Sequence, residues 1–397
     1  GATYIWSGPN GFVSALQNPS IANVSMAANG VYTITVTSAN GCSISSTTSA
    51  IINPLPAVVA NNDTTLCEGQ TLNLTVTPTP GATYNWSGPN GFTAALQNPS
   101  IANVTMAATG VFTITVTSAN GCSNSDTINV IINPLPTVVA NNDTTLCQGQ
   151  TLDLTVTPTA GATYNWSGPN GFTSALQNPS IANVSMAANG VYTITVTSAN
   201  GCTNSDTINV IINPLPTVVA NNDTTLCQGQ TLNLTVTPTP NAFYNWTGPN
   251  GFNSALQNPS IANVTMAATG VYTITVTSAN ACTNSDSINV IINPLPTVIA
   301  NNDTTLCEGQ TLDLTVTATP GATYNWTGPN GFISALQNPS IANVSMAANG
   351  VYTITVSSAN GCTNSDTTSV IINLLPTVIA NNDTTLCEGQ TLDLTVT

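Results

Sequence analysis

The stretch from residue 110 to residue 122 reads Gly-Val-Phe-Thr-Ile-Thr-Val-Thr-Ser-Ala-Asn-Gly-Cys. Phe112, Ile114 and Val116 fall on one face of an extended chain and the intervening threonines fall on the other, because side chains alternate along a strand. Valine and threonine favour strands, and the Asn-Gly pair that follows is a turn signal. The stretch therefore predicts a β-strand with one buried and one solvated face, closed by a turn.

This stretch belongs to a unit that recurs every 80 residues, with near-identical copies of it beginning at residues 30, 190, 270 and 350. One tryptophan per unit keeps the same step, and its place in an alternating pattern predicts a core residue at Trp6, Trp86, Trp166, Trp246 and Trp326. The cysteines form two ladders with this step, one being Cys42, Cys122, Cys202, Cys282 and Cys362 and the other Cys67, Cys147, Cys227, Cys307 and Cys387. Tandem copies of one unit provide length, valency or stiffness, whereas a single copy is enough for an active site. The repetition therefore favours a structural or adhesive protein.

Alternation with a period of two continues through the rest of the unit. In one unit it predicts seven short strands, lettered A (57–62), B (71–77), C (83–87), C′ (92–97), E (101–106), F (111–118) and G (125–133). No segment of the unit keeps a helical period. Seven strands in 80 residues, apolar on one face and polar on the other, predict an all-β fold built of β-sandwiches.

A stiff Asn-Pro-Leu-Pro connector, seen at residues 133–136, separates the units. It predicts an elongated rod whose complete modules span residues 54–133, 134–213, 214–293 and 294–373. Residues 1–53 form a partial module with strands C to G of the sandwich, and residues 374–397 a partial module with strands A and B. Because residue 1 falls inside a unit, we expect the sequence to be a segment of a longer protein.

The composition excludes several functions. The 397 residues contain no lysine, arginine or histidine, and 15 acidic residues give a net charge of −15. Without cationic side chains there is nothing to neutralise phosphates, so we expect no nucleic-acid partner. Without histidine or lysine there is no imidazole base and no Schiff base, and we expect no enzyme. No apolar run approaches the ~20 residues of a membrane span.

The sequence resembles the tandem immunoglobulin-like (Ig-like) and PKD-like repeats of large bacterial cell-surface adhesins of the gliding and biofilm-forming type. The residues that carry the resemblance are Cys67-Glu68-Gly69, Tyr84-Asn85-Trp86 and the stretch 110–122. The resemblance covers the whole chain. It implies Ig-like modules, export by a type IX system and extracellular display on the cell surface. It carries over no catalytic residues.

The cysteines are expected to be oxidised, as in secreted proteins. In an Ig-like sandwich Cys67 lies at one end and Cys122 at the other, roughly 26 Å away, whereas disulfide Cα atoms lie within about 7 Å. Strand G leaves a module at the end near Cys67 and enters the next module beside its F–G turn. The intermodule pairs Cys67–Cys202, Cys147–Cys282 and Cys227–Cys362 are therefore one prediction. Intramodule pairs such as Cys67–Cys122, and free thiols, remain the alternatives.

Aspartate followed by threonine or serine matches the O-glycosylation pattern of the exported proteins that the chain resembles. It selects Thr64, Thr127, Thr144, Thr207, Thr224, Ser287, Thr304, Thr367 and Thr384 as candidate glycosylation sites. The alternative is that these pairs are ordinary turn and strand-start residues. No cofactor is expected. Calcium at Asn61-Asn62-Asp63 is a weak candidate, because calcium requires six to eight oxygens and usually several carboxylates.

The leading functional hypothesis is the structural shaft of a secreted surface adhesin or filament, extending a binding tip. The alternative is an array of carbohydrate- or protein-binding modules that gains affinity by multivalency. The expected partners are other surface proteins or glycans, or further copies in a filament.

Overall fold

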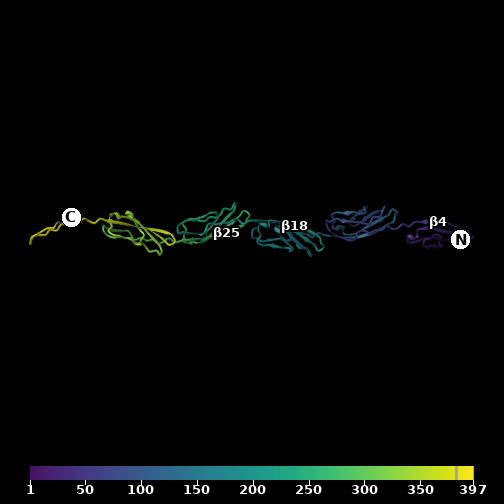
Figure 1. Cartoon of the computed structure of the whole chain (residues 1–397), viewed down its shortest axis with the longest axis horizontal. Coiled ribbons are helices and arrows are strands. Elements are labelled where there is room, and N and C mark those ends of the chain that lie inside the picture. Colours follow the sequence, from purple (N-terminus) through teal and green to yellow (C-terminus); the bar gives the residue numbers. More distant parts are fainter. Residues whose placement is uncertain (381–382, 397) are drawn as a thin grey trace. The chain divides into compact units, whose positions relative to one another are not determined.

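The computed structural model describes residues 1–380 and 383–396. In these residues the secondary structure consists of strands and single-turn 3₁₀ helices, with no α-helix. Each 80-residue stretch forms its own cluster of strands (Figure 1). The chain divides into two compact units, Gly1–Ile212 and Asn213–Thr397. No helix in this part of the chain is long and apolar enough to cross a bilayer.

Residues 54–133 illustrate the complete module. Its elements are β5 (Thr64–Cys67), β6 (Leu72–Asn73), β7 (Thr83–Ser87), η3 (Pro89–Gly91), β8 (Thr93–Ala94), β9 (Ser100–Ile101), η4 (Met106–Ala108), β10 (Gly110–Thr117) and β11 (Ser123–Asn133).

The next three stretches repeat this order. Residues 134–213 contain β12 (Thr144–Cys147), β13 (Leu152–Asp153), β14 (Thr163–Ser167), η5 (Pro169–Gly171), β15 (Thr173–Ser174), β16 (Ser180–Ile181), η6 (Met186–Ala188), β17 (Gly190–Thr197) and β18 (Thr203–Asn213). Residues 214–293 contain β19 (Thr224–Cys227), β20 (Leu232–Asn233), β21 (Phe243–Thr247), η7 (Pro249–Gly251), β22 (Asn253–Ser254), β23 (Ser260–Ile261), η8 (Met266–Ala268), β24 (Gly270–Thr277) and β25 (Thr283–Asn293). Residues 294–373 contain β26 (Thr304–Cys307), β27 (Leu312–Asp313), β28 (Thr323–Gly328), η9 (Pro329–Gly331), β29 (Phe332–Ser334), β30 (Ser340–Ile341), η10 (Met346–Ala348), β31 (Gly350–Ser357) and β32 (Thr363–Asn373).

Each complete module is a sandwich of a five-stranded and a two-stranded sheet. In residues 54–133 the larger sheet has the order β5-β11-β10-β7-β8, and β6 pairs with β9 in the smaller one. Strands β10 and β11 form a long antiparallel hairpin, with Phe112 opposite Ile128 and Thr113 opposite Thr127. Strand β5 joins the free edge of β11 in parallel, which places Cys67 opposite Asn133.

The core lies between the two sheets. The inward residues of the hairpin are completely or almost completely buried, and Trp86 packs beside them with 0% exposure. Leu72, Leu74 and Val76 close the core from the smaller sheet, with exposures of 1%, 0% and 5%. The threonines between the buried residues face outward, so the period-two pattern of the sequence corresponds to the two faces of the larger sheet.

The N-terminal stretch, residues 1–53, contains only part of the sandwich. Its elements are β1 (Thr3–Ser7), η1 (Pro9–Gly11), β2 (Val13–Ser14), η2 (Met26–Ala28), β3 (Gly30–Thr37) and β4 (Ser43–Ala50). They form one sheet with the order β2-β1-β3-β4. In the C-terminal stretch the described residues after Asn373 form no named strand, and an isolated bridge pairs Ala380 with Val396.

The all-β fold of repeated sandwiches is confirmed, but four of the seven strand predictions differ from the structure. Residues 71–77 contain only the two-residue strand β6 and an isolated bridge at Val76, and residues 92–97 contain only the two-residue strand β8. Residues 57–62 contribute only an isolated bridge between Ala60 and Val76. Of residues 101–106, only Ile101 belongs to a strand. The extended run ends because Asn103 takes a left-handed conformation (φ 51°). Val104 instead exchanges backbone hydrogen bonds with the loop at residues 69–70. The four-residue strand β5 was not predicted, since its sequence, Thr-Thr-Leu-Cys, does not alternate between polar and apolar residues.

Candidate functional site

The first candidate site is the junction between successive modules, where Cys67 ends β5. The Cys67 amide donates a hydrogen bond to Gln70 Oε1 (2.8 Å), and the Glu68 amide donates to Asn133 O (2.9 Å). Gly69 takes a φ of +85°, which permits the tight turn after the cysteine. These bonds hold Cys67 beside the last residue of the same module's final strand.

Cys202 lies in the next module, directly after the turn between β17 and β18. The Ser198 amide donates to Cys202 O (2.9 Å), and the Gly201 amide donates to Ser198 O (2.9 Å). The turn also contacts the preceding strand end, since Asn200 Nδ2 donates to Asn133 Oδ1 (3.3 Å). Cys67 and Cys202 form a disulfide with a Cα–Cα distance of 5.6 Å.

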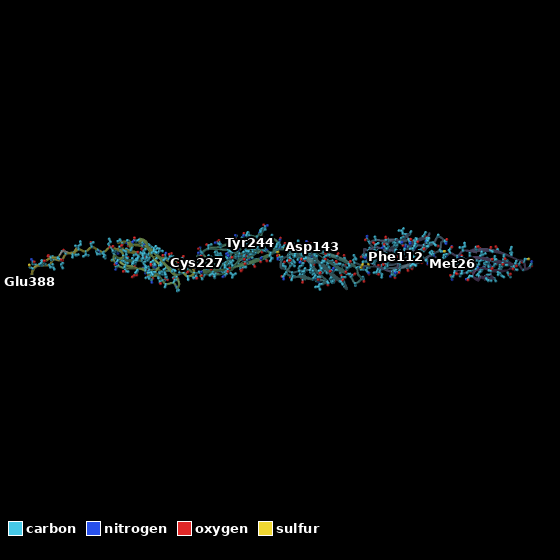
Figure 2. The ribbon with its side chains drawn as sticks, in the orientation of Figure 1. Met26, Phe112, Asp143, Cys227, Tyr244 and Glu388 are labelled. Carbon is cyan, nitrogen blue, oxygen red and sulfur yellow. A yellow bond between two sulfur atoms is a disulfide. The ribbon has the colours of Figure 1, made fainter. Side chains whose placement is uncertain are left out.

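The same arrangement recurs further along the chain. Cys227, labelled in Figure 2, forms a disulfide with Cys362, again with a Cα–Cα distance of 5.6 Å and a sequence separation of 135. Cys147 and Cys282 are also disulfide-bonded. The two pairings that the structure specifies are of the intermodule kind, and Cys67 pairs with Cys202 rather than Cys122. The cysteines with free thiols are Cys42, Cys122, Cys307 and Cys387.

The linker before each module is held by the module that follows it. Asn204 Nδ2 donates to Pro136 O (3.0 Å), and Asn284 Nδ2 donates in the same way to Pro216 O (3.0 Å). The prolines also fix φ angles within the linker. Three restraints therefore act at a junction: the prolines, this hydrogen bond and the disulfide.

The aspartates of the Asp-Thr pairs bond to backbone groups. Asp126 accepts hydrogen bonds from the Ala60 amide (2.9 Å) and the Thr127 amide (2.8 Å), and Asp63 accepts one from the Asn129 amide (2.8 Å). They connect the segment before β5 to β11. Within the described residues no three acidic or cysteine side chains come together as a metal site, and the carboxylate of Asp63 beside Asn61 and Asn62 is engaged by β11.

The candidate glycosylation sites fall into two groups. The exposed ones are Thr127, Thr207, Ser287, Thr367 and Thr384, and the half-buried ones in the edge strands are Thr64, Thr144, Thr224 and Thr304. The tryptophans also differ: Trp86, Trp166, Trp246 and Trp326 have 0% exposure, whereas Trp6 is half-buried. The buried indole of Trp86 donates its Nε1–H to Gln97 O (3.1 Å).

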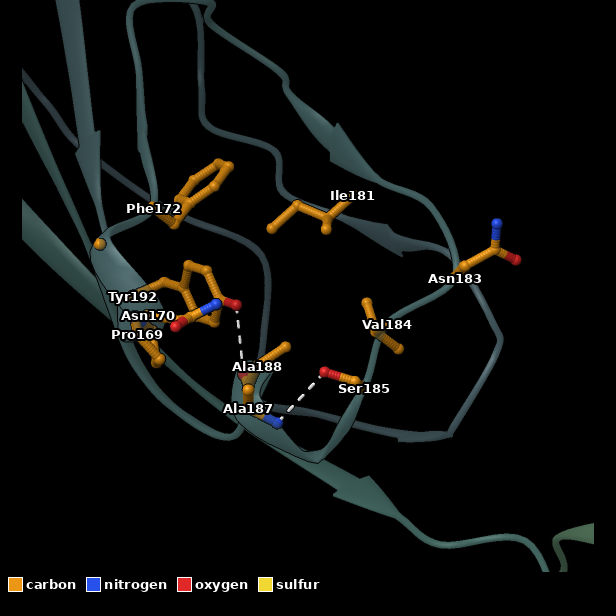
Figure 3. Close-up of a pocket in the computed structure, with 11 residues that line it drawn as sticks. Pro169, Asn170, Phe172, Ile181, Asn183, Val184, Ser185, Ala187, Ala188 and Tyr192 are labelled. Carbon is orange, nitrogen blue, oxygen red and sulfur yellow. Dashed lines mark hydrogen bonds between the residues drawn. The ribbon is translucent and has the colours of Figure 1, made fainter.

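A second candidate site, which the sequence did not indicate, is a cavity that recurs in each complete module. In residues 134–213 it has a volume of about 260 Å³, with walls from Pro169, Phe172, Val184 and Tyr192. Phe172 and Ile181 face it in Figure 3, while the side chain of Asn183 points away. Its counterparts in the other three complete modules measure about 230, 230 and 210 Å³.

The walls of this cavity are fixed by close packing. Phe172 and Tyr192 meet edge to face with ring centroids 5.5 Å apart. A Cβ atom on Gly168 would lie 2.4 Å from Cδ1 of Tyr192, so the chain approaches the ring as only glycine can. The Tyr192 hydroxyl donates to Ala188 O (3.1 Å; Figure 3). The lining thus offers apolar surface and amide groups, with no carboxylate to take part in acid–base chemistry.

Burial changes the acidity of the tyrosines in these walls. It raises the pKa of Tyr192, Tyr272 and Tyr352, because the phenolate loses solvation. Phe112 takes the equivalent position in residues 54–133, so the hydroxyl is not needed for the packing. The constant pieces of sequence around the cavity, Pro-Asn-Gly and Ile-Ala-Asn-Val, were the signal that could have located it.

The sheet order, the buried tryptophan and the 80-residue period define a tandem array of Ig-like β-sandwich domains. Residues 54–134, 134–216 and 294–376 match the profile of the family described as "Ig-like domain CHU_C associated", and residues 213–292 match that of a "PKD-like domain". The three ranges that match the CHU_C-associated profile together cover more than half of the chain. The chain therefore belongs to the CHU_C-associated Ig-like domain family.

Comparison with solved structures finds multidomain chains at low sequence identity and low TM-scores. "Sidekick-1 immunoglobulin domains 1-5" is 13% identical, with 94% of this chain and 93% of that chain covered and a TM-score of 0.25. The N-terminal eight Ig domains of Down Syndrome Cell Adhesion Molecule are 14% identical, with coverage of 94% and 58% and a TM-score of 0.29. Drosophila OTK extracellular domains 3–5 are 13% identical, with coverage of 59% and 95% and a TM-score of 0.28. No match was found among curated proteins.

Proposed function

We propose that the chain is the structural shaft of a secreted bacterial surface adhesin or filament, and that its modules extend and display a binding tip. The observation that carries this proposal is the disulfide between Cys67 and Cys202, which connects two modules instead of stabilising one. A crosslink at a junction restricts the angle between neighbours, and a shaft requires that restriction.

The composition supports the same role. Outward threonines line the larger sheet, and the exposed Asp-Thr positions would carry O-linked sugars in the native protein. Disulfides persist in oxidising surroundings, so the proposed location is extracellular, at the cell surface. The proposal includes no catalytic activity, no cofactor and no nucleic-acid partner. Its partners would be other surface proteins or glycans, or further copies of the chain.

The shaft can be tested by small-angle scattering of the oxidised chain and of a variant with Cys67→Ser and Cys227→Ser. We expect the oxidised chain to show a long maximum dimension with a narrow cross-section, and the variant to show a shorter average dimension because its junctions bend. A compact particle in the oxidised state would contradict the proposal. The variant Cys122→Ser, which removes a free thiol, is the matched control.

The second candidate function is a multivalent carbohydrate- or protein-binding array. The specific observation that favours it is the cavity beside Phe172, which recurs in every complete module. Weak sites repeated along one chain would gain affinity through multivalency. Glycan-array binding that disappears when Val184→Trp and its counterparts fill the cavities would support this function. Binding that is unchanged by the filled cavities would exclude these sites.

A further inference from the structure

The segment that enters a complete module runs beside the last strand of that module. In the first complete module β5 lies parallel to β11 and ends with Cys67 opposite Asn133. Before β5, the Ala60 amide donates to Asp126 Oδ2 (2.9 Å), a partner 66 positions further along the chain. Every pairing of β5 with β11 has the same offset in sequence, so this part of the segment advances step for step with β11.

The alignment extends back to the linker. Asn124 Nδ2 donates to Pro56 O (3.0 Å), which places the first residues of the module beside the start of β11. The sequence offset is 68 at this contact and 66 at Ala60, so the entering segment has only two residues more than the strand beside it. At the rise of an extended strand, two residues amount to about 7 Å. The entering segment is therefore almost fully extended.

The disulfide continues this extended segment into the next module. The Cα atoms of Cys67 and Cys202 are 5.6 Å apart, and Cys202 is followed directly by β18, an uninterrupted strand of 11 residues. A covalent path therefore crosses both modules as one extended segment, one disulfide and one long strand. It bypasses residues 68–201, which include the buried Trp86 and Trp166.

The second half of the chain contains the same path. Strands β19 and β25 pair in parallel, with Cys227 opposite Asn293. The Cα atom of Cys227 is 5.6 Å from that of Cys362, and the 11-residue strand β32 follows Cys362. Residues 228–361 are bypassed. Because the backbone is continuous from Cys202 to Cys227, the two paths are joined covalently.

We propose that the intermodule disulfides make the array resistant to stretching, and that a pulling force is carried by one short covalent path. This tension-bearing path consists of residues 54–67, 202–227 and 362–373, joined by the two disulfides. The other strands of the modules lie in closed loops that carry no tension. The inference rests on the proposed shaft and adds a property, limited extensibility, that is measured separately from stiffness.

The physical reason is the geometry of a crosslinked chain. Two tethered points cannot move further apart than the shortest covalent connection between them allows, and this connection is already extended. A chain without the bridges lengthens as its modules unfold, by about 3.3–3.6 Å for each residue released. With the bridges in place, pulling does not reach the hairpin of β10 and β11 or the core behind it.

The remaining disulfide-bonded cysteines provide a matched control. Cys147 and Cys282 are also disulfide-bonded, and each lies inside one of the two bypassed loops. Neither belongs to the tension-bearing path. Removing their disulfide bonding therefore removes the same kind of crosslink from the chain without lengthening that path.

The test stretches single molecules of the oxidised 397-residue chain between tags at its two ends, using optical tweezers. The first variant combines Cys67→Ser with Cys202→Ser. Because their bridge spans 135 positions, we expect the fully stretched contour length to grow by about 440–480 Å. A second variant, Cys227→Ser with Cys362→Ser, should give the same increment, since its bridge also spans 135 positions.

The control combines Cys147→Ser with Cys282→Ser and should reach the same contour length as the parent. A parent that already extends as far as the first variant would overturn the proposal, as would a control that lengthens by the same increment. A gain of only about 180–200 Å in the first variant would also contradict it, because that length corresponds to a bridge from Cys67 to Cys122 within one module.

A core substitution shows whether the sandwich itself carries tension. Trp86→Ala should lower the force of one unfolding step in the variant without Cys67 and Cys202, where the strand of Trp86 is under load. It should leave the high-force curve of the bridged chain unchanged. A curve of the bridged chain that Trp86→Ala alters would show that the sandwich carries the force.

Scattering separates this inference from the proposed function. A chain that is long and narrow in solution, yet lengthens in the tweezers as far as the variant without Cys67 and Cys202, would retain the shaft and lose the tension-bearing path. A compact particle in the oxidised state would remove both.

Discussion

Cys67 and Cys202 belong to different modules and lie 135 residues apart in sequence, yet their Cα atoms are 5.6 Å apart in a disulfide. Cys67 lies beside Asn133, the last residue of its own module's final strand, and Cys202 follows a turn whose Asn200 contacts that same asparagine. Strand pairing and a side-chain hydrogen bond therefore act beside the disulfide in joining the end of one sandwich to the next.

Removing this disulfide should destabilise the junction more than the interior of a module. We expect Cys67→Ser to lower the free energy of unfolding by about 2–4 kcal/mol, the usual contribution of a native disulfide. Calorimetry should also show adjacent modules unfolding at more widely separated temperatures. Cys122→Ser is the control and should leave the thermogram unchanged, because its thiol is free. If Cys67→Ser gave the same thermogram as the parent, the disulfide would contribute nothing to the stability of the junction.

The tryptophans offer a matched pair for the core. Trp86 is 0% exposed and its indole donates to Gln97 O, whereas Trp6 is half-buried beside a cavity that Phe12 and Val24 also line. We expect Trp86→Ala to cost about 3–5 kcal/mol and Trp6→Ala clearly less, because fewer contacts are lost there. Denaturant unfolding of reduced, dilute protein measures both values. Equal losses would show that the difference in burial between the two tryptophans does not set the cost.

The aspartate in the middle of the last strand should matter for stability. Asp206 accepts hydrogen bonds from the Ala140 and Thr207 amides, so Asp206→Ala leaves both donors without their acceptor. We expect a loss of about 1–3 kcal/mol, confined to that module. Asp153→Ala, at an exposed position, is the control and should stay within about 0.5 kcal/mol of the parent. Two variants of equal stability would show that the carboxylate bonds contribute nothing.

The buried tyrosines predict a stability that falls at alkaline pH. Burial raises the pKa of Tyr192, Tyr272 and Tyr352 above the unfolded value of 10.0, so the folded state holds its phenolic protons more tightly. The stabilising contribution is complete below that unfolded pKa and is lost as the pH rises through the folded one. Denaturant unfolding of the parent at about pH 8 and about pH 11 measures this loss.

A triple tyrosine-to-phenylalanine variant at these positions should lose this part of the pH dependence. The native Phe112 shows that the site accepts phenylalanine. At neutral pH we expect a cost of about 0.5–1.5 kcal/mol at each position for the lost hydrogen bond to a backbone carbonyl. If the variant and the parent lose the same stability between the two pH values, the tyrosines are not the cause.

The exposed Asp-Thr and Asp-Ser positions should carry the O-linked sugars, if the native protein carries any. We expect occupancy at Thr127, Thr207, Ser287 and Thr367 to exceed that at Thr64 and its half-buried counterparts, because a transferase must reach the hydroxyl. Site-resolved mass spectrometry of protein from its own cells measures both groups. A bare mass of 40.5 kDa for this segment would exclude the modification.

The alternation of apolar and polar residues, together with the 80-residue repeat, was sufficient to predict the sandwiches from the sequence. In the strand at 110–117 the residues predicted to face inward are the buried ones. The short strand β5 and the break at Asn103 were missed, since both depend on contacts with distant backbone rather than on local pattern. The cavity beside Phe172 was also missed, because its walls come from separate segments of the chain that only the fold brings together. The disulfide alternatives stayed open in the sequence because pairing is a property of three-dimensional proximity.

The central claim is that disulfides join neighbouring modules, and non-reducing peptide mapping of the oxidised chain tests it most directly. Trypsin has no site in a chain without lysine or arginine, but chymotrypsin cuts after aromatic residues such as Trp86 and Phe92 and so separates Cys67 from Cys122. No aromatic residue lies between Cys202 and Cys227, so these two cysteines stay on one peptide. The account predicts one linked set of three peptides, in which Cys67 is joined to Cys202 and Cys227 to Cys362. A pair that links Cys67 to Cys122 would contradict it.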